Sequence, residues 1–401
     1  MSRKAAGTLV LPWGTNSSRV SPRVGMDQVL LCVTMMLTIV GLVMVFSASA
    51  VLAGNRFHDS WYYLKRQCVW LAVGLILLHL LSRVDYVWWK RLSLPLLGGM
   101  TTLLVLVLLP SLGLTANGAR RWLGVGPIAI QPAEMLKLGL VVYLAAYLTR
   151  KEDGIQDFRT GLLPALMVVG LISGLVLMEP DLGTVVVLGL VTGSLLFVGG
   201  ARLSHLSTLV LCAVPIGLAL VLSTEYRRQR LMAFLEPWSD ASDTGFQITQ
   251  SFLAFGSGGL FGVGLGEGKQ KLFFLPEAHT DFVLALIGEE LGFVGAGVII
   301  ILFAVFMIRG FQISTRARVP FGRYLGIGIT TLIGIQAIVN ACVVTGLVPT
   351  KGLTLPFVSY GGSSLVVSLA GVGMLLSISR DRHAGREEME HRRDHGWASY
   401  R

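Results

Sequence analysis

The sequence has little charge. Only 14% of its 401 residues are Asp, Glu, Lys or Arg, whereas 53% are hydrophobic and the mean hydropathy is +0.69. A soluble protein carries about 25% charged residues. This shortage excludes an ordinary soluble globular protein and indicates a membrane protein, so a lipid bilayer is the first expected partner.

Cysteine is also scarce. Cys32, Cys68, Cys212 and Cys342 lie in or at the edge of apolar runs. They have neither the spacing of a metal site nor that of a small secreted disulfide protein, so we interpret them as packing residues. The net charge is +10, but the basic residues follow the loops and form no patch interleaved with aromatic residues. We therefore expect no nucleic-acid partner.

Long apolar runs make up most of the chain. An α-helical span needs about 20 mostly apolar residues, which predicts an all-α polytopic membrane protein with about ten transmembrane helices. The predicted spans are 29–53, 67–82, 92–112, 130–149, 161–178, 183–200, 203–223, 282–308, 324–347 and 361–379. The basic segment before the first run is too long for a cleaved signal peptide, so we expect an uncleaved first span.

Lys and Arg are unevenly divided between the loops. With the N-terminus inside, 21 of the 33 would be cytoplasmic and 11 would be outside, so both termini are predicted in the cytoplasm. We expect a cytoplasmic segment 1–28, a transmembrane domain 29–379 and a cytoplasmic tail 380–401 that is disordered or weakly helical. The predicted outer loops are 54–66, 113–129, 179–182, 224–281 and 348–360.

The loop 224–281, between the seventh and eighth spans, is the largest. About 58 residues are too many for a passive connector. Within it, 247–255 mixes polar and apolar residues and predicts a short interfacial helix. The glycine-rich run 256–266 lacks the Lys-Ser/Thr of a phosphate-binding loop, so we favour a flexible, closely packed backbone there.

Titratable groups gather where this loop meets the eighth run. Glu277, His279 and Asp281 come directly before it, and Glu289 and Glu290 lie near its start. Protonation is easily tuned at such a low-dielectric edge. We expect one of the two adjacent glutamates to face inward and the other to lie near the membrane interface.

Two charged residues open the fourth span. Glu134 and Lys137 are three residues apart and share a helix face. Because a lone charge in a membrane is costly, they are paired, line a wet cavity, or both. A pair that only joins helices remains possible, but we favour a polar cavity that opens outward, since Arg120, Arg121 and Asp281 are expected on that side.

The last loop, 349–364, is rich in Pro, Gly and hydroxyl groups and cannot be regular helix throughout. Irregular backbone at membrane depth survives only where it lines protein or a water-filled cavity. The loop carries Lys351 and Ser359 and suits either an anionic ligand or a plain re-entrant turn. Together these groups predict an outward-facing site for an anionic, lipid-linked diphosphate.

Five motifs resemble those of the SEDS family (shape, elongation, division and sporulation), and they fall in order across the membrane region. They are NGARRWL at 117–123, QPAEMLKL at 131–138, EPDLGT at 179–184, LPEAHTDFVLALIGEELG at 275–292 and LPFVSYGGSS at 355–364. The EMLKL form, the GLTLPFVSYGGSS ending and the long basic N-terminus are more similar to the cell-division (FtsW) type than to the RodA type.

This resemblance implies a peptidoglycan glycosyltransferase of the bacterial inner membrane, acting at the division septum. Such an enzyme polymerises lipid II and releases undecaprenyl diphosphate. The implied partners are a class B penicillin-binding transpeptidase, FtsI, and the FtsQ–FtsL–FtsB complex. A Mg²⁺ or Mn²⁺ ion is expected from the substrate charge and the family, although no HxxxE-type ligand set appears in the sequence.

The resemblance also implies site residues. The essential aspartate of the family matches Asp281, which would act as general base, and its conserved arginine matches Arg121. The other candidate substrate-binding residues are Lys137, Glu134, Arg120, His279, Ser359, Lys351 and Glu289. Two alternatives remain: a lipid II flippase, which would need a polar path through both leaflets where the inner halves look apolar, and a non-catalytic scaffold that recruits the transpeptidase.

Overall fold

The computed structural model describes residues 26–116, 119–125, 128–152, 154–239, 245–272 and 278–396. Most of the predicted segment 1–28 and the end of the predicted tail therefore lie outside the described residues. The long helices are α1 (Gln28–Phe57), α2 (Tyr62–Arg83), α3 (Val87–Leu108), α4 (Pro132–Arg150), α5 (Leu163–Met178), α6 (Leu182–Val198), α7 (Leu203–Leu222), α11 (Gly292–Thr315), α12 (Pro320–Val344) and α13 (Gly362–Gly396).

The shorter elements lie between these helices in the sequence. They are β1 (Gly113–Ala116), β2 (Ala119–Val125), β3 (Ile128–Ile130), the π-helical turn η1 (Phe158–Leu162), α8 (Glu225–Leu235), α9 (Phe246–Gly258) and α10 (Val283–Glu290). The helix α9 confirms the short helix predicted at 247–255. The helix α13 runs past the predicted end of the last span and into the predicted tail.

The helices confirm an all-α polytopic membrane protein. Among the described residues, nine helical segments are long and apolar enough to cross a membrane, and the apolar helix α6 has 17 residues. These ten helices correspond to the ten predicted spans. The helices α4, α12 and α13 are largely buried by their neighbours, whereas α7 is exposed along its apolar length. The helices α4, α12 and α13 therefore form the centre of the bundle.

The prediction of one continuous eighth span from residue 282 to 308 is wrong. The chain breaks at Leu291 and Gly292, and Gly292 has φ of +70°. A Cβ atom on Gly292 would collide with the backbone of Leu260 and Gly262. The first amides of α11 donate to this neighbouring run, from Phe293 N to Gly259 O at 2.9 Å and from Val294 N to Leu260 O at 3.1 Å. The glycine-rich run is thus closely packed, as predicted, and it caps α11.

The loop predicted at 113–129 contains a small antiparallel sheet with strand order β1-β2-β3. Leu114 pairs with Trp122 and Leu123 pairs with Ile130. Asn117 and Gly118, which belong to the first family motif, lie outside the described residues. The sheet is the one feature of the described chain that departs from an all-helical architecture, and it carries Arg120 and Arg121.

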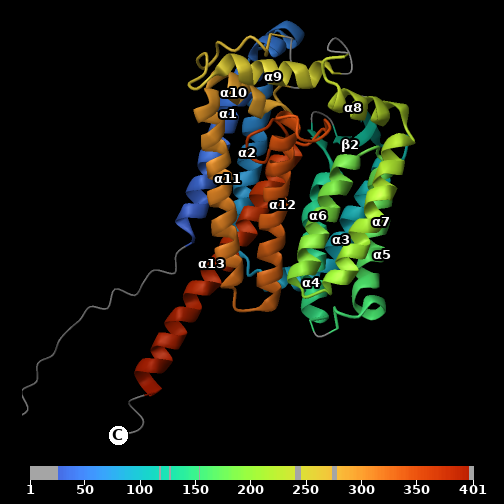
Figure 1. Cartoon of the computed structure of the whole chain (residues 1–401). Helices are drawn as coiled ribbons and strands as arrows, with labels where there is room; N and C mark the ends of the chain where they lie inside the picture. The colour runs from blue at the N-terminus through green and yellow to red at the C-terminus, as the bar shows by residue number, and fades with distance from the viewer. Residues whose placement is uncertain are drawn as a thin grey trace, which may run out of the picture.

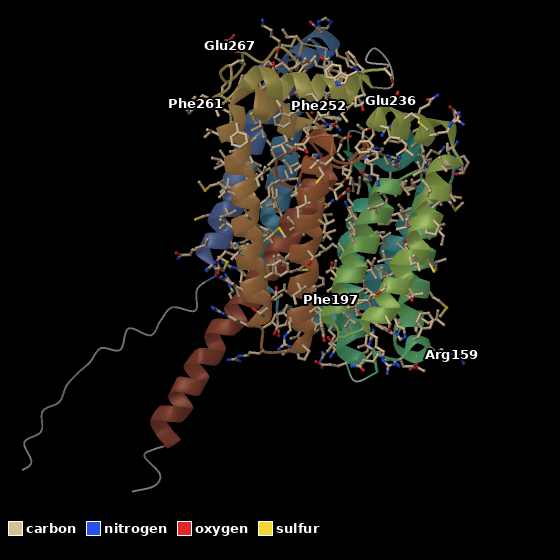
Figure 2. The ribbon with its side chains drawn as sticks, in the orientation of Figure 1. Arg159, Phe197, Glu236, Phe252, Phe261 and Glu267 are labelled. Atoms are coloured by element: carbon tan, nitrogen blue, oxygen red, sulfur yellow. The ribbon has the colours of Figure 1, made fainter. Side chains whose placement is uncertain are left out.

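The two ends of the bundle differ (Figure 1). The helices α8, α9 and α10 lie at one end, which we call the α9 end. Glu236, Phe252, Phe261 and Glu267 extend there, whereas Arg159 lies at the opposite end (Figure 2).

The first and the last helix of the membrane domain, α1 and α13, contact each other at the end of the bundle opposite the α9 end. The Asp27 amide donates to Ser379 Oγ at 3.2 Å, which joins the start of α1 to α13. Arg309 of α11 pairs with Asp27 at 2.7 Å. The two termini of the membrane domain are therefore on the same face of the bundle, as the predicted topology requires.

Candidate functional site

Asp281 lies where two segments far apart in sequence meet at the α9 end. Asn340 of α12 donates from Nδ2 to Asp281 O at 2.8 Å and to Leu353 O at 2.7 Å. A Cβ atom on Gly352 would lie 3.0 Å from Asp281 Oδ2. One carboxamide therefore joins the backbone of Asp281 to that of the irregular last loop, and the Asp281 carboxylate lies beside Gly352.

The first turns of α2 brace the same two segments. Gln67 donates to Ser359 O at 3.3 Å and accepts from Gly361 N at 3.4 Å. The ring of His279 packs against Tyr63 and Tyr360, with centroids 4.9 and 5.6 Å away, and its carbonyl accepts from Tyr360 N. His279 is thus a buried part of the loop packing.

Ser359 serves the loop internally. Its Oγ accepts from Leu355 N at 2.8 Å, and its side chain is buried. A hydroxyl that closes a turn of its own backbone is a common local structure. The Ser359 hydroxyl therefore bonds to the backbone of its own loop, for which the sequence left both an anionic ligand and a plain re-entrant turn open.

Arg121 connects the sheet to the turn between α5 and α6. Its Nε donates to Glu179 O at 2.9 Å and its Nη2 donates to Pro180 O at 2.7 Å. In the same turn, Asp181 caps α6 by accepting from the Thr184 amide and hydroxyl. Arg120, the next residue on β2, is exposed. Arg121 is therefore the arginine that the structure brings to the site.

Lys351, in the last loop, lies between the α5–α6 turn and Asp281. Its neighbour Leu353 packs within about van der Waals distance of Gly183 at the start of α6. Burial lowers the pKa of the Lys351 ammonium, and the negative charge of Asp181 opposes this effect. The carbonyl of Thr350 accepts from Arg230 Nη1 of α8 at 3.3 Å. We call Arg121, Glu179, Asp181, Asp281 and Lys351 the polar site.

Glu134 and Lys137 form a buried ion pair inside the bundle. The Lys137 Nζ lies 2.7 Å from the Glu134 carboxylate, and only 1% of the Lys137 side chain is exposed. Both residues line a small cavity between α4, α12 and α13, together with Gln336 and Ser368. Gln336 is one helical turn, about 6 Å, from Asn340 on α12. The two residues are thus paired within one helix, α4, so their pair does not join two helices. They line a small cavity whose other walls are mostly apolar, and an outward opening of that cavity stays a prediction.

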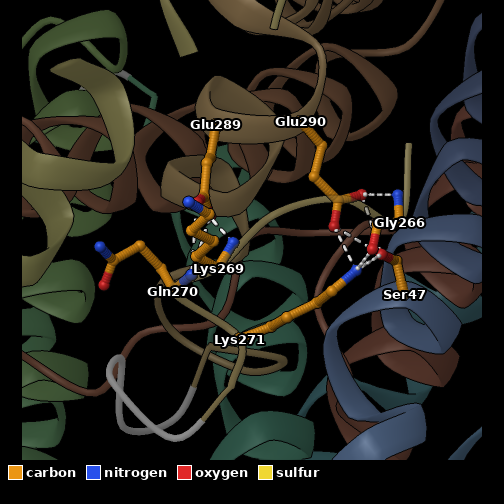
Figure 3. Close-up of polar contacts among 7 residues, drawn as sticks. All are labelled: Ser47, Gly266, Lys269, Gln270, Lys271, Glu289 and Glu290. Carbon is orange, nitrogen blue, oxygen red and sulfur yellow. Dashed lines mark hydrogen bonds and ion pairs between the residues drawn. The ribbon is translucent and has the colours of Figure 1, made fainter. Parts of the chain in front are cut away.

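Glu289 and Glu290 are both buried, so the prediction that one of them faces inward holds for both, and a position of the other near the membrane interface stays a prediction. Glu289 accepts from the amides of Lys269 and Gln270, at 2.7 and 3.3 Å. Glu290 accepts from Ser47 of α1 and pairs with Lys271 at 2.8 Å (Figure 3). The two carboxylates hold the outer loop against α10 and α1, because they accept hydrogen bonds from the backbone amides of the loop. The structure therefore gives Glu289 a loop-binding role.

Sequence reasoning missed Asn340, Gln67 and Glu179 as site residues. Asn340 and Gln67 are lone polar residues in or beside apolar runs, a pattern that marks functional positions in membrane helices. Glu179 lies within a family motif but was not selected. Glu277, part of the predicted acidic cluster, lies outside the described residues.

These features define a class: a multi-pass helical membrane protein whose polar site is built from irregular segments at one end of the bundle. The model of the cell cycle protein family of FtsW, RodA and SpoVE matches residues 27–384. The chain belongs to this family, and it is therefore a multi-pass protein of a bacterial membrane. The resemblance to the SEDS family is confirmed.

Curated relatives match nearly the whole chain. A probable peptidoglycan glycosyltransferase FtsW of Geobacter sulfurreducens is 48% identical over 353 residues, which cover 88% of this chain and 95% of the relative. Stage V sporulation protein E of Bacillus subtilis is 45% identical over 354 residues, covering 88% and 97%. The relatives named FtsW support the FtsW type over the RodA type.

Solved structures share the fold. A chain from a study of polymerization and crosslinking by a peptidoglycan synthase complex has a TM-score of 0.73 and 32% identity, covering 89% of this chain and 98% of that one. The rod shape determining protein RodA of Thermus thermophilus has a TM-score of 0.65 and 32% identity, with the same coverage.

Proposed function

We propose that this protein is a peptidoglycan glycosyltransferase that polymerises lipid II and that Asp281 is its general base. The observation that carries this proposal is the placement of the Asp281 carboxylate beside Gly352, with the Asp281 backbone held by Asn340. Lys351 and Arg121 supply positive charge in the same polar site. The relatives named peptidoglycan glycosyltransferase support the same activity.

The reaction is a single inverting displacement. The 4-hydroxyl oxygen of the acceptor sugar forms a bond to the anomeric carbon of the donor, and the bond from that carbon to the diphosphate oxygen breaks. The leaving undecaprenyl diphosphate keeps the bonding electron pair, and Asp281 takes the hydroxyl proton. A positioned carboxylate of this kind contributes about 10²- to 10⁴-fold to the rate.

The leaving diphosphate requires positive charge at the moment the bond breaks. Arg121 and Lys351 are fixed near the site by the α5–α6 turn and the last loop. We assign them to the diphosphate, because preorganised cations cost no reorganisation during the reaction. Lys137 is buried in its pair with Glu134, and we propose that the small cavity it lines lies below the polar site.

A divalent cation fits this site poorly as a group held by the protein alone. The described residues contain no cluster of three or more His, Cys, Asp or Glu side chains that could hold a metal ion. Both oxygens of the Asp181 carboxylate already bind Thr184. A Mg²⁺ or Mn²⁺ ion would therefore have to take most of its ligands from the substrate diphosphate.

Partners and location follow from the relatives. One structural relative comes from a complex that coordinates polymerization with crosslinking. This supports our proposal of a class B transpeptidase, FtsI, as the partner of this chain. We propose regulation by the FtsQ–FtsL–FtsB complex and action at the division septum from the resemblance to the FtsW type alone.

The test is polymerisation of lipid II by the purified full chain with its transpeptidase. Asp281→Asn removes the base while it keeps the shape of the side chain, so we expect the rate to fall by about 10²- to 10⁴-fold. The matched control is Asp59→Asn, at a partly exposed acid between α1 and α2 that pairs with Lys65 away from the polar site, and this variant should retain the rate. Normal polymerisation by Asp281→Asn would refute the proposal. Transport of lipid II across liposomes without polymerisation would favour the flippase.

A further inference from the structure

Glu179 is a buried carboxyl group that the proposed reaction does not use. Its side chain is 0% exposed, and neither Oε1 nor Oε2 has a hydrogen-bond partner. A buried polar group without a partner costs free energy, and an ionised one costs far more. This carboxyl group therefore favours its neutral form, and its lack of a partner requires an explanation.

Arg121, which we assign to the diphosphate in the proposed reaction, is a neighbour of Glu179. Arg121 of β2 donates to the backbone carbonyls of residues 179 and 180, not to the Glu179 carboxylate. Asp181, two residues further on, is occupied with the cap of α6, and its negative charge acts on Lys351 of the last loop. The guanidinium thus lies next to an acid that it does not bind.

The charges around Glu179 agree with this geometry. Burial, and after it the negative charge of Asp181, raise the pKa of Glu179 to about 8, although Arg121 opposes both. The group is therefore neutral at pH 7 and ionises as the pH rises through about 8. Ionisation would place a new negative charge beside Arg121.

We propose that Glu179 is a positioning residue for Arg121. While its carboxyl group is neutral, Arg121 stays on the two turn carbonyls with its remaining N–H groups available to the diphosphate. When the group ionises, the guanidinium moves into a salt bridge with the Glu179 carboxylate and leaves the substrate. The proposal deepens the proposed function and rests on it, since the diphosphate is the ligand that Arg121 would release.

The first experiment follows kcat/KM for lipid II polymerisation against pH. The wild type should lose about tenfold in kcat/KM per pH unit above the Glu179 transition, mainly through a rise in KM. Glu179→Gln keeps the neutral shape but cannot ionise, so its profile should lack this decline. The matched control Glu236→Gln, at an exposed acid of the α9 end, should keep it. An identical alkaline decline in wild type and Glu179→Gln would overturn the proposal.

A second experiment needs no activity. Infrared difference spectra of the full chain in nanodiscs should contain the C=O band of a protonated carboxyl group at pH 7, which disappears above pH of about 8 and is missing in Glu179→Gln. If that band is the same in both proteins, Glu179 is ionised and the proposal fails. If the band titrates but the wild type never polymerises lipid II, the proposed function fails and the titration of Glu179 stands.

Discussion

At the scale of single residues, the pair of Glu134 and Lys137 shows how a charge is kept inside a membrane protein. Lys137 is 1% exposed and its ammonium lies against the Glu134 carboxylate. Removal of one partner from a buried pair typically costs about 3–5 kcal/mol, because the other charge is left alone. Replacement of both by uncharged residues is often neutral. The pair therefore offers a way to separate stability from substrate binding.

We predict that Lys137→Met or Glu134→Gln alone lowers the free energy of unfolding by about 3–5 kcal/mol. The double variant should recover most of this loss. If Lys137 also contacts the diphosphate, the recovered double variant will fail to polymerise lipid II. Thermal unfolding in detergent and the polymerisation assay measure the two effects separately.

The outcome decides between the two interpretations of the pair. A double variant that is stable and fully active would show that the pair contributes only to the stability of the bundle. A double variant as unstable as either single variant would show that the charges are not coupled in the way the 2.7 Å contact implies.

At the scale of elements, the apolar runs located the membrane helices because length and hydropathy determine what can cross a bilayer. The same runs could not reveal the break at Gly292. The residues on both sides are apolar, and the break depends on a backbone of φ +70° that glycine alone adopts easily. The sheet at 113–130 was also missed, since its strands are short and follow an apolar run.

We predict that Gly292→Ala strongly destabilises the protein. The left-handed backbone costs an alanine about 1–3 kcal/mol, and its Cβ would collide with the backbone of Leu260 and Gly262. The matched control is Gly297→Ala on the same helix, where a Cβ atom meets nothing within 4 Å. Melting temperatures in detergent should fall for the first variant and stay level or rise for the second.

Equal melting temperatures for the two variants would contradict the packing of the glycine-rich run against α11.

The site shows the same division between what a sequence can and cannot reveal. Asp281 and Lys351 stand out in the sequence as charges beside apolar runs, whereas the choice of Arg121 depends on the resemblance to the SEDS family. Asn340 and the loop-binding role of Glu289 could not be predicted, since both depend on which backbone groups fold against them.

At the scale of the whole molecule, the two ends of the membrane domain meet through Asp27, Ser379 and Arg309. The polar site lies at the α9 end of the bundle. The unequal distribution of Lys and Arg predicts that the α9 end faces outward and the opposite end faces the cytoplasm. A substrate that is used outside the membrane would then reach Asp281 directly.

We predict that alkaline phosphatase fused after Trp238 is active in cells and that a fusion after Arg318 is inactive. A green fluorescent protein fused after Arg318 should be fluorescent, because that position follows α11 on the predicted cytoplasmic side. The reverse pattern would invert the topology and would place the polar site on the wrong side for polymerisation outside the cell.

Asn340 has a mechanical consequence for the intact enzyme. Its carboxamide is anchored on α12 and binds the backbone of both Asp281 and Leu353. If α12 tilts when a partner binds, the proton acceptor and the loop beside it travel as a single piece. Control from outside would then act on how the lipid substrate approaches, while the spacing inside the reaction centre stays constant.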